Sequence, residues 1–129
     1  MSIADFYSRF AEWADSVLAE SVPDGVVAFS VSLYEGVGTF DVQINGAPTF
    51  DLNDDDWACE VVYSTGEDLF QIPREQVGNR WESALELVLE LVKRYLSSGG
   101  RAETLRAGRA VAVGFVDGDL HLVWPGAAA

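Results

Sequence analysis

Two stretches of the chain carry apolar residues at helical spacing. In the first stretch, residues three or four positions apart form one apolar face: Ile3, Phe6, Tyr7, Phe10, Trp13, Ala14, Val17 and Leu18. Ser2 with Asp5 three residues later has the pattern of a capping box, and Pro23 lies beyond the last apolar position. The pattern predicts an amphipathic helix that begins after Ser2 and ends before Pro23.

The second stretch contains the widest apolar stripe in the chain. Its members are Trp81, Ala84, Leu85, Val88, Leu91, Val92, Tyr95 and Leu96. Asn79 and Glu82 repeat the capping-box spacing at its start, and the Gly-Gly pair at 99–100 marks its end. We expect this helix to form the backbone of the core, with one further helical turn in residues 102–107.

Strands are indicated by side chains that alternate with a period of two. Residues 27–34 and 40–45 alternate between apolar and polar or small side chains, and the glycine-rich connection between them favours an antiparallel hairpin. Residues 57–63 alternate in the same way. This third segment predicts a strand with Cys59, a small hydrophobic side chain, on its buried face.

Residues 47–52 allow two interpretations. The Asn-Gly pair at 45–46 is a turn signal, and a three-residue loop would pair Val42 with Phe50 in a further strand. Pro48 removes one hydrogen-bond donor from such a ladder. The segment is either a short edge strand or an ordered loop.

The Asp-Gly pair at 117–118 predicts a terminal hairpin with a two-residue type I′ turn. That turn makes every facing pair apolar on one face: Phe115 with Leu120, Val113 with Leu122, and Val111 with Trp124. His121 then lies on the outer face of the sheet. The element order is α-β-β-(β)-β-α-β-β, which predicts an α+β fold in a single domain, residues 1–129: an antiparallel sheet of about five strands with two main helices packed on one face.

Charge is unevenly distributed along this sequence. The 129 residues include 21 Asp and Glu against 8 Lys and Arg, a formal net charge of −13, and residues 1–73 hold 14 of the acids with Arg9 as their only base. Direct binding of nucleic acid or of an anionic membrane surface depends on clustered Lys and Arg, so neither partner is expected. No apolar run reaches membrane-spanning length, and acids interrupt the first 20 residues, so we expect a cytoplasmic protein.

The sequence contains few of the residue patterns that a catalytic site or a metal site requires. Cys59 and His121 are single representatives of their types, and nothing supplies the orienting group that a nucleophile and base require. Asp51, Asn53 and Asp55 match the first three ligand positions of a calcium loop, but Asp56 replaces the glycine at its sixth position and Val62 the glutamate at its twelfth. We expect no catalysis, no cofactor and no metal.

The acids around Trp57 are suited to protein binding, because aromatic side chains anchor interfaces and carboxylates steer a basic partner. The predicted partner-binding residues are Asp51, Asp54, Asp55, Asp56, Trp57, Glu60, Glu67 and Asp68. Two alternatives remain at this point. Trp57 is equally well the first core residue of its strand, and arginines after residue 73 would cover the acids if the fold brought them together.

Two segments carry a resemblance to a known class of proteins. Residues 50–60 (FDLNDDDWACE) and 112–120 (AVGFVDGDL), about 20 residues in all, resemble small acidic immunity proteins of bacterial polymorphic toxin systems. The resemblance implies a cytosolic protein that occupies a toxin domain, commonly a cationic nuclease, and carries over no catalytic residue. It leads us to expect an antitoxin-type protein with a basic protein partner, either monomeric or a homodimer.

A second resemblance concerns the arrangement of elements alone. Type III secretion chaperones are also small and acidic, with the order α, three β, α, two β. They usually end in a further helix, which the residues after Trp124 do not predict. A chaperone of a secreted effector is therefore the alternative function.

Overall fold

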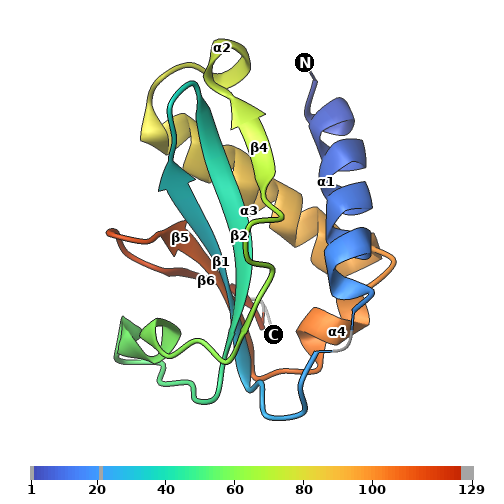
Figure 1. Cartoon of the computed structure of the whole chain (residues 1–129), viewed down its shortest axis with the longest axis vertical. Coiled ribbons are helices and arrows are strands. Elements are labelled where there is room, and N and C mark those ends of the chain that lie inside the picture. The colour runs from blue at the N-terminus through green and yellow to red at the C-terminus, as the bar shows by residue number, and fades with distance from the viewer. Residues whose placement is uncertain (1, 21, 126–129) are drawn as a thin grey trace.

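The computed structural model describes residues 2–20 and 22–125. Its elements follow in this order: α1 (Ile3–Leu18), β1 (Ala28–Glu35), β2 (Thr39–Ala47), the 3-10 helix η1 (Asp55–Cys59), β3 (Tyr63–Ser64), β4 (Phe70–Pro73), α2 (Arg74–Val77), α3 (Trp81–Ser98), α4 (Ala102–Arg106), β5 (Ala110–Phe115) and β6 (His121–Trp124). Figure 1 shows α1 on one side of the long β1–β2 hairpin, and the green segment with η1 on the other. The predicted α+β fold class is confirmed.

The strands form one mixed sheet in the order β3-β2-β1-β5-β6, and β4 also pairs with β2. The predicted β1–β2 hairpin is confirmed, with Val31 opposite Ile44. The prediction of a wholly antiparallel sheet is wrong, because β1 and β5 pair in parallel, with Val31 opposite Val113. Parallel neighbours need a long crossover connection, and here that crossover includes α3.

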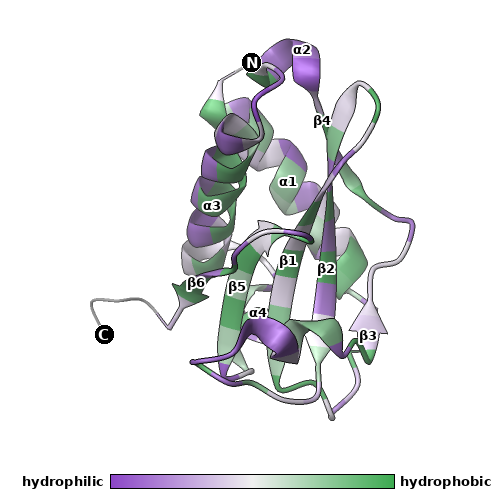
Figure 2. Ribbon diagram, turned by 90° about the vertical axis from the view of Figure 1, so that its left-hand side faces the viewer, coloured by the Kyte–Doolittle hydropathy of each residue, from purple (hydrophilic) through white to green (hydrophobic). Residues whose placement is uncertain are grey.

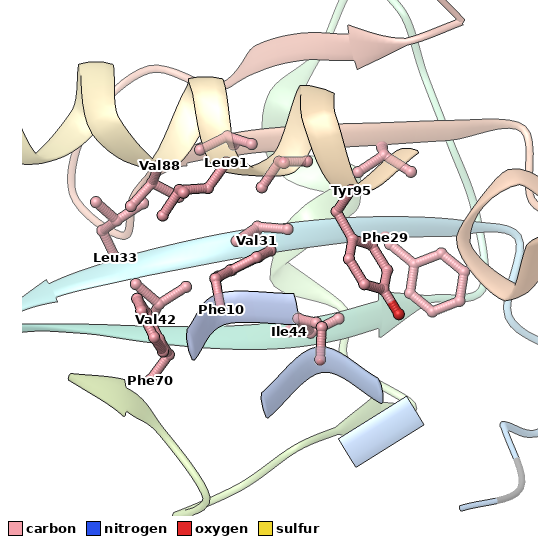
Figure 3. Packing of buried hydrophobic residues seen from close by; sticks show 14 of the residues in the cluster. Phe10, Phe29, Val31, Leu33, Val42, Ile44, Phe70, Val88, Leu91 and Tyr95 are labelled. Carbon is pink, nitrogen blue, oxygen red and sulfur yellow. The ribbon is translucent and has the colours of Figure 1, made fainter. Parts of the chain in front are cut away.

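One face of the sheet is covered by α1 and α3, as the sequence predicts. Large side chains of the strands, such as Phe29, Val31 and Ile44, meet Phe10 of α1 and Leu91 of α3 in one buried cluster. Figure 3 shows these side chains together in the cluster. Complete burial of each such side chain contributes roughly 1.5–3 kcal/mol, so this cluster is the main source of folding free energy.

The first helix begins as predicted, with the Ser2 hydroxyl accepting a hydrogen bond from the Asp5 N–H at 3.2 Å. Tyr95 of α3 then joins three elements: its hydroxyl donates to Asp15 Oδ1 of α1 at 2.6 Å and accepts from the Arg101 N–H at 3.0 Å. Burial, together with the hydrogen bond to Asp15, raises the pKa of Tyr95 above the ordinary tyrosine value. The neutral hydroxyl therefore holds α1, α3 and the turn before α4 together.

The start of α3 differs from the prediction. Its N-cap is Arg80, without a side-chain hydrogen bond, so Asn79 does not form a capping box. Instead, Glu82 pairs with Arg80 at 3.2 Å. The pKa of Glu82 is held below its usual value, first by a hydrogen bond from its own backbone and then by the hydrogen bond from Arg80. The end at Gly99 and the extra helical turn of α4 are confirmed.

The middle of the chain departs most from the predicted strands. β2 runs through the Asn-Gly pair at 45–46, and residues 48–54 form a loop, which settles the open question about residues 47–52. Residues 57–63 are not a strand: η1 takes Asp55–Cys59, and only Tyr63–Ser64 pair with β2. A strand that the pattern did not predict, β4, pairs with the other half of β2.

The terminal hairpin has a longer connection than predicted. Val111 faces Trp124 as expected, but Val113 faces His121, with a bulge between. The turn closes by a hydrogen bond from the Gly118 N–H to the Phe115 carbonyl at 3.0 Å, and five residues separate the strands. In the described ranges, 2–20 and 22–125, no helix is both long and apolar enough to span a membrane.

Candidate functional site

The face of the sheet opposite α1 and α3 is built from small and polar side chains. Figure 2 shows β6, β5, β1 and β2 side by side. Side chains alternate between the two faces of a strand, so every second residue of these strands lies on the outer face. The main contributors are Ala28, Ser30, Ser32, Tyr34, Gln43, Asn45, Ala112 and Gly114, which alternate with core residues on the same strands. Small side chains leave room above the sheet for another segment to approach.

The segment around η1 covers one end of this outer face. Trp57 lies in a second, smaller buried cluster with Ala28, Ala47, Ala110 and Ala112, and its ring packs edge-on against Phe50 at 5.3 Å between centroids. Only 6% of Trp57 is exposed. Trp57 is therefore a core residue, although it lies in a 3-10 helix and not in a strand. Its side chain is not available as an exposed anchor for a partner, so that prediction is wrong.

Local hydrogen bonds, between residues two positions apart, explain why the acidic run folds into a helical turn. The Asp51 carboxylate accepts from the Asn53 N–H at 2.9 Å, and the Asp54 carboxylate accepts from the Asp56 N–H at 3.0 Å as the N-cap of η1. Aspartates favour such caps over strand pairing. The alternating pattern in residues 57–63 gave no sign of this competition.

A groove of about 440 Å³ remains between η1 and the β5–β6 turn, with the outer face of β1, β2 and β5 as its floor. Its lining consists of Ser30, Ser32, Tyr34, Asn45, Asp55, Asp56, Ala58, Cys59, Val61, Gly114, Phe115, Val116, Gly118 and Leu120. Figure 1 shows both walls, the green η1 segment and the tip of the red hairpin, on the side of the sheet away from α1.

The two walls are joined by a contact between distant parts of the chain. The Leu120 N–H donates to the Asp55 carboxylate at 3.3 Å, and Leu120 packs against the cluster that contains Trp57. The connection between β5 and β6 therefore contacts a segment that is 65 positions away in the sequence. Within the hairpin, Gly114 lets the β5–β6 connection lie close against β5, because a Cβ there would lie 2.4 Å from the Asp119 carbonyl oxygen.

The floor of the groove is a fixed hydrogen-bonded layer. Gln43 accepts at Oε1 from the Tyr34 hydroxyl at 2.9 Å and from the Asn45 amide at 3.1 Å, and donates to the Gly66 carbonyl at 2.7 Å. The Asn45 amide also donates to Ser32 Oγ at 3.2 Å. These bonds orient the side chains of Tyr34, Gln43 and Asn45 without any ligand.

The acids near the groove are not covered by the arginines that follow residue 73. Asp51, Asp54, Asp55, Asp56 and Glu60 are all exposed. Across the described residues, none of the arginines from 74 to 109 forms an ion pair with them, and Arg74 instead lies 3.8 Å from Glu35. The charge therefore remains on the surface at this end of the molecule.

The eight predicted partner-binding residues lie in two separate segments of the structure. Glu67 and Asp68 are exposed but lie in the β3–β4 connection, where the Asp68 carbonyl accepts a hydrogen bond from the indole of Trp13 in α1 at 3.1 Å. Asp55, by contrast, contacts the hairpin turn beside the groove. The predicted residues thus form two separate acidic segments, of which only the first borders the groove.

Sequence reasoning missed the exposed aliphatic side chains beside the groove. Leu52 is 70% exposed, Val116 57%, Val61 49% and Leu122 43%. Leu52 and Leu122 line a smaller hollow that shares Asp55 and Leu120 with the groove. We use the term acidic-apolar face for Asp51, Leu52, Asp55, Asp56, Val61, Val116 and Leu122. For Leu52 the available signal was its position among the aspartates of a segment that the sequence left open as a loop, whereas Val61 was placed in a predicted strand and gave no such signal.

Cys59 and His121 lie in different places. Cys59 is exposed and lines the groove, so its prediction as a buried residue is wrong. His121 is exposed in a second groove with Trp81 of α3, and it pairs with the core residue Val113, so its predicted position on the outer face of the sheet is wrong. Within residues 2–20 and 22–125, no three His, Cys, Asp or Glu side chains are grouped so that they could hold a metal ion.

Comparisons with family models, with curated proteins and with solved structures found no match to this chain.

Proposed function

We propose that this protein is a non-catalytic, immunity-type binding protein that neutralises a basic toxin domain by occlusion. The acidic-apolar face makes the contact. The observation that carries the proposal is the exposure of Leu52, Val61 and Val116 among carboxylates that no arginine after residue 73 pairs with. Exposed aliphatic groups beside an open groove are typical of an interface.

The two kinds of side chain have different roles in binding. The carboxylates attract a basic partner at long range and raise the association rate, an effect that high salt weakens. The aliphatic side chains and the groove bury apolar area once the partner has docked, which slows dissociation. Because Trp57 holds the η1 wall from beneath, it preserves the face without touching the partner.

The test uses matched charge reversals in the two acidic segments. The partner is the basic domain encoded by the gene next to that of this protein, and its association rate is measured at low and high salt. In D56K/E60K, two exposed carboxylates near the groove become lysines. Neither forms a hydrogen bond among the described residues. The control E67K/D68K makes the same charge change in the other segment.

We expect D56K/E60K to lower the association rate at low salt by roughly tenfold or more and to flatten its salt dependence. E67K/D68K changes the rate by about threefold at most. Equal effects of the two variants, or no effect of either, would contradict the proposal, as would a neighbouring gene whose product is not basic or does not bind. Sedimentation separates the chaperone alternative, which requires a dimer bound to an extended segment of its effector.

A further inference from the structure

In residues 2–20 and 22–125, three polar residues have buried side chains, and all three line the groove. They are Ser30, Ser32 and Asn45, on the adjacent strands β1 and β2. Buried hydroxyl and amide groups are costly unless each finds a hydrogen-bond partner. The floor of a groove is the place where a ligand supplies such partners.

Two oxygen atoms on this floor lack a partner. Ser30 is 3% exposed and forms no side-chain hydrogen bond among the described residues, and Asn45, 7% exposed, uses its NH₂ group and leaves Oδ1 without a donor. In the same residues, no side-chain oxygen or nitrogen atom is both fully buried and unpartnered. The Ser30 Oγ and Asn45 Oδ1 atoms therefore open into the groove.

The ligand that fits these acceptors is cationic. Asp55 and Asp56 stand at the groove, and no Lys, Arg or His lines it. The lining also includes Val61, Val116 and Leu120, which suit the apolar stem of a long side chain. A guanidinium offers five N–H donors and is less strongly hydrated than an ammonium, so it enters a partly buried site at lower cost.

We propose that the groove receives one arginine side chain of the basic partner, with the guanidinium directed at Ser30 Oγ, Asn45 Oδ1 and the carboxylate of Asp56. The stem of that arginine passes between Val61 and Val116. This inference rests on the proposed function, because it assigns to the partner the group that enters the site.

The probe is the blocked tripeptide acetyl-Gly-Arg-Gly-amide, titrated into ¹⁵N-labelled protein and followed by NMR. Its neutral match replaces arginine with citrulline, which has nearly the same shape. We expect saturable shifts of the Asn45 side-chain amide and of the Ser30 and Leu120 backbone amides, with half-saturation on the order of 1 mM. The citrulline tripeptide binds at least tenfold more weakly.

Two variants test separately the floor of the groove, at Ser30, and the carboxylate at its edge, at Asp56. S30A removes an acceptor that has no hydrogen-bond partner in residues 2–20 and 22–125, and D56N removes one charge; each weakens binding of the arginine tripeptide threefold or more. The control D68N, in the other acidic segment, leaves binding unchanged. Equal binding of the citrulline tripeptide, or shifts that are as large around Glu67 and Asp68 as in the groove, overturns the inference.

The two proposals fail in different ways. If the tripeptide does not bind in the groove while D56K/E60K still slows association with the basic partner, the arginine inference is overturned and the proposed function stands. If the basic partner does not bind the protein at all, the proposed function is overturned, and with it the assignment of the arginine to that partner.

Discussion

The two faces of the sheet are made by the same strands and differ in what covers them. On the face toward α1 and α3, residues such as Phe29, Val31 and Leu33 are fully enclosed. On the outer face, their neighbours Ser30 and Ser32 are also buried, but they line the groove between η1 and the β5–β6 turn. The strand period of two thus separates the residues that fold the protein from those that we propose bind its partner.

This difference has a consequence for mutations. Substitutions on the helix-covered face should lower the free energy of unfolding without a specific effect on binding. Substitutions of groove residues outside the Trp57 cluster should change binding while leaving the free energy of unfolding almost unchanged. The variants below test this separation, from the largest expected change in stability to the smallest.

The largest effect is expected for Phe10→Ala on the helix-covered face. Phe10 is buried and packs against Phe70 and Tyr95, with ring centroids 5.4 and 6.0 Å away. The cavity should reduce the free energy of unfolding by about 3–5 kcal/mol. Urea denaturation measures it, and a loss below about 1 kcal/mol would show that this face does not dominate stability.

Trp57→Ala should have the next largest effect, about 2–3 kcal/mol, because the second cluster is smaller than the first. Its consequence is local as well. Amides of residues 55–61 should exchange hydrogen faster, whereas those of β1 and β2 retain their protection. Uniformly faster exchange over the whole sheet would contradict the separation of the two faces.

Tyr95→Phe removes the hydroxyl that joins Asp15 to Arg101, which should cost about 1–2 kcal/mol near neutral pH. The pH dependence has a definite sign. Because the folded-state pKa of Tyr95 is raised, its contribution is complete below the ordinary tyrosine pKa of 10.0 and is lost as pH rises above that value. The free energy of unfolding should therefore fall less steeply above pH 10 in Tyr95→Phe than in the wild type.

The smallest change in stability is expected for Ser30→Ala, within about 0.5 kcal/mol, since the hydroxyl has no partner in the described protein. The same variant should nevertheless weaken binding of the basic partner. Thermal unfolding and the dissociation constant are measured on one preparation. A loss of stability as large as that of Tyr95→Phe would mean that Ser30 belongs to the core.

The elements with strong local patterns were predictable from sequence. The stripes of α1 and α3 and the alternation in β1 and β2 are each long enough to indicate both the element and its buried face. The sequence left open whether the carboxylates from Asp51 to Glu60 are exposed or covered, and the structure shows that they are exposed. In these segments, tertiary contacts reinforce what the local sequence favours.

The groove could not be predicted, because contacts between distant residues create it. The bond from Leu120 to Asp55 joins residues 65 positions apart. Trp57 turns inward because Asp54 caps a helical turn, which a period-two interpretation does not consider. The free oxygen of Asn45 follows from its bonds to Ser32 and Gln43, which are known only once β1 and β2 are paired.

The most direct test of the central claim is hydrogen–deuterium exchange of the protein alone and in complex with its basic partner. If the outer face binds, residues 55–61 and 116–120 become protected, while the exposed sides of α1 and α3 remain unchanged. Protection confined to α1 or α3, with the groove segments exchanging as in the free protein, would contradict the account.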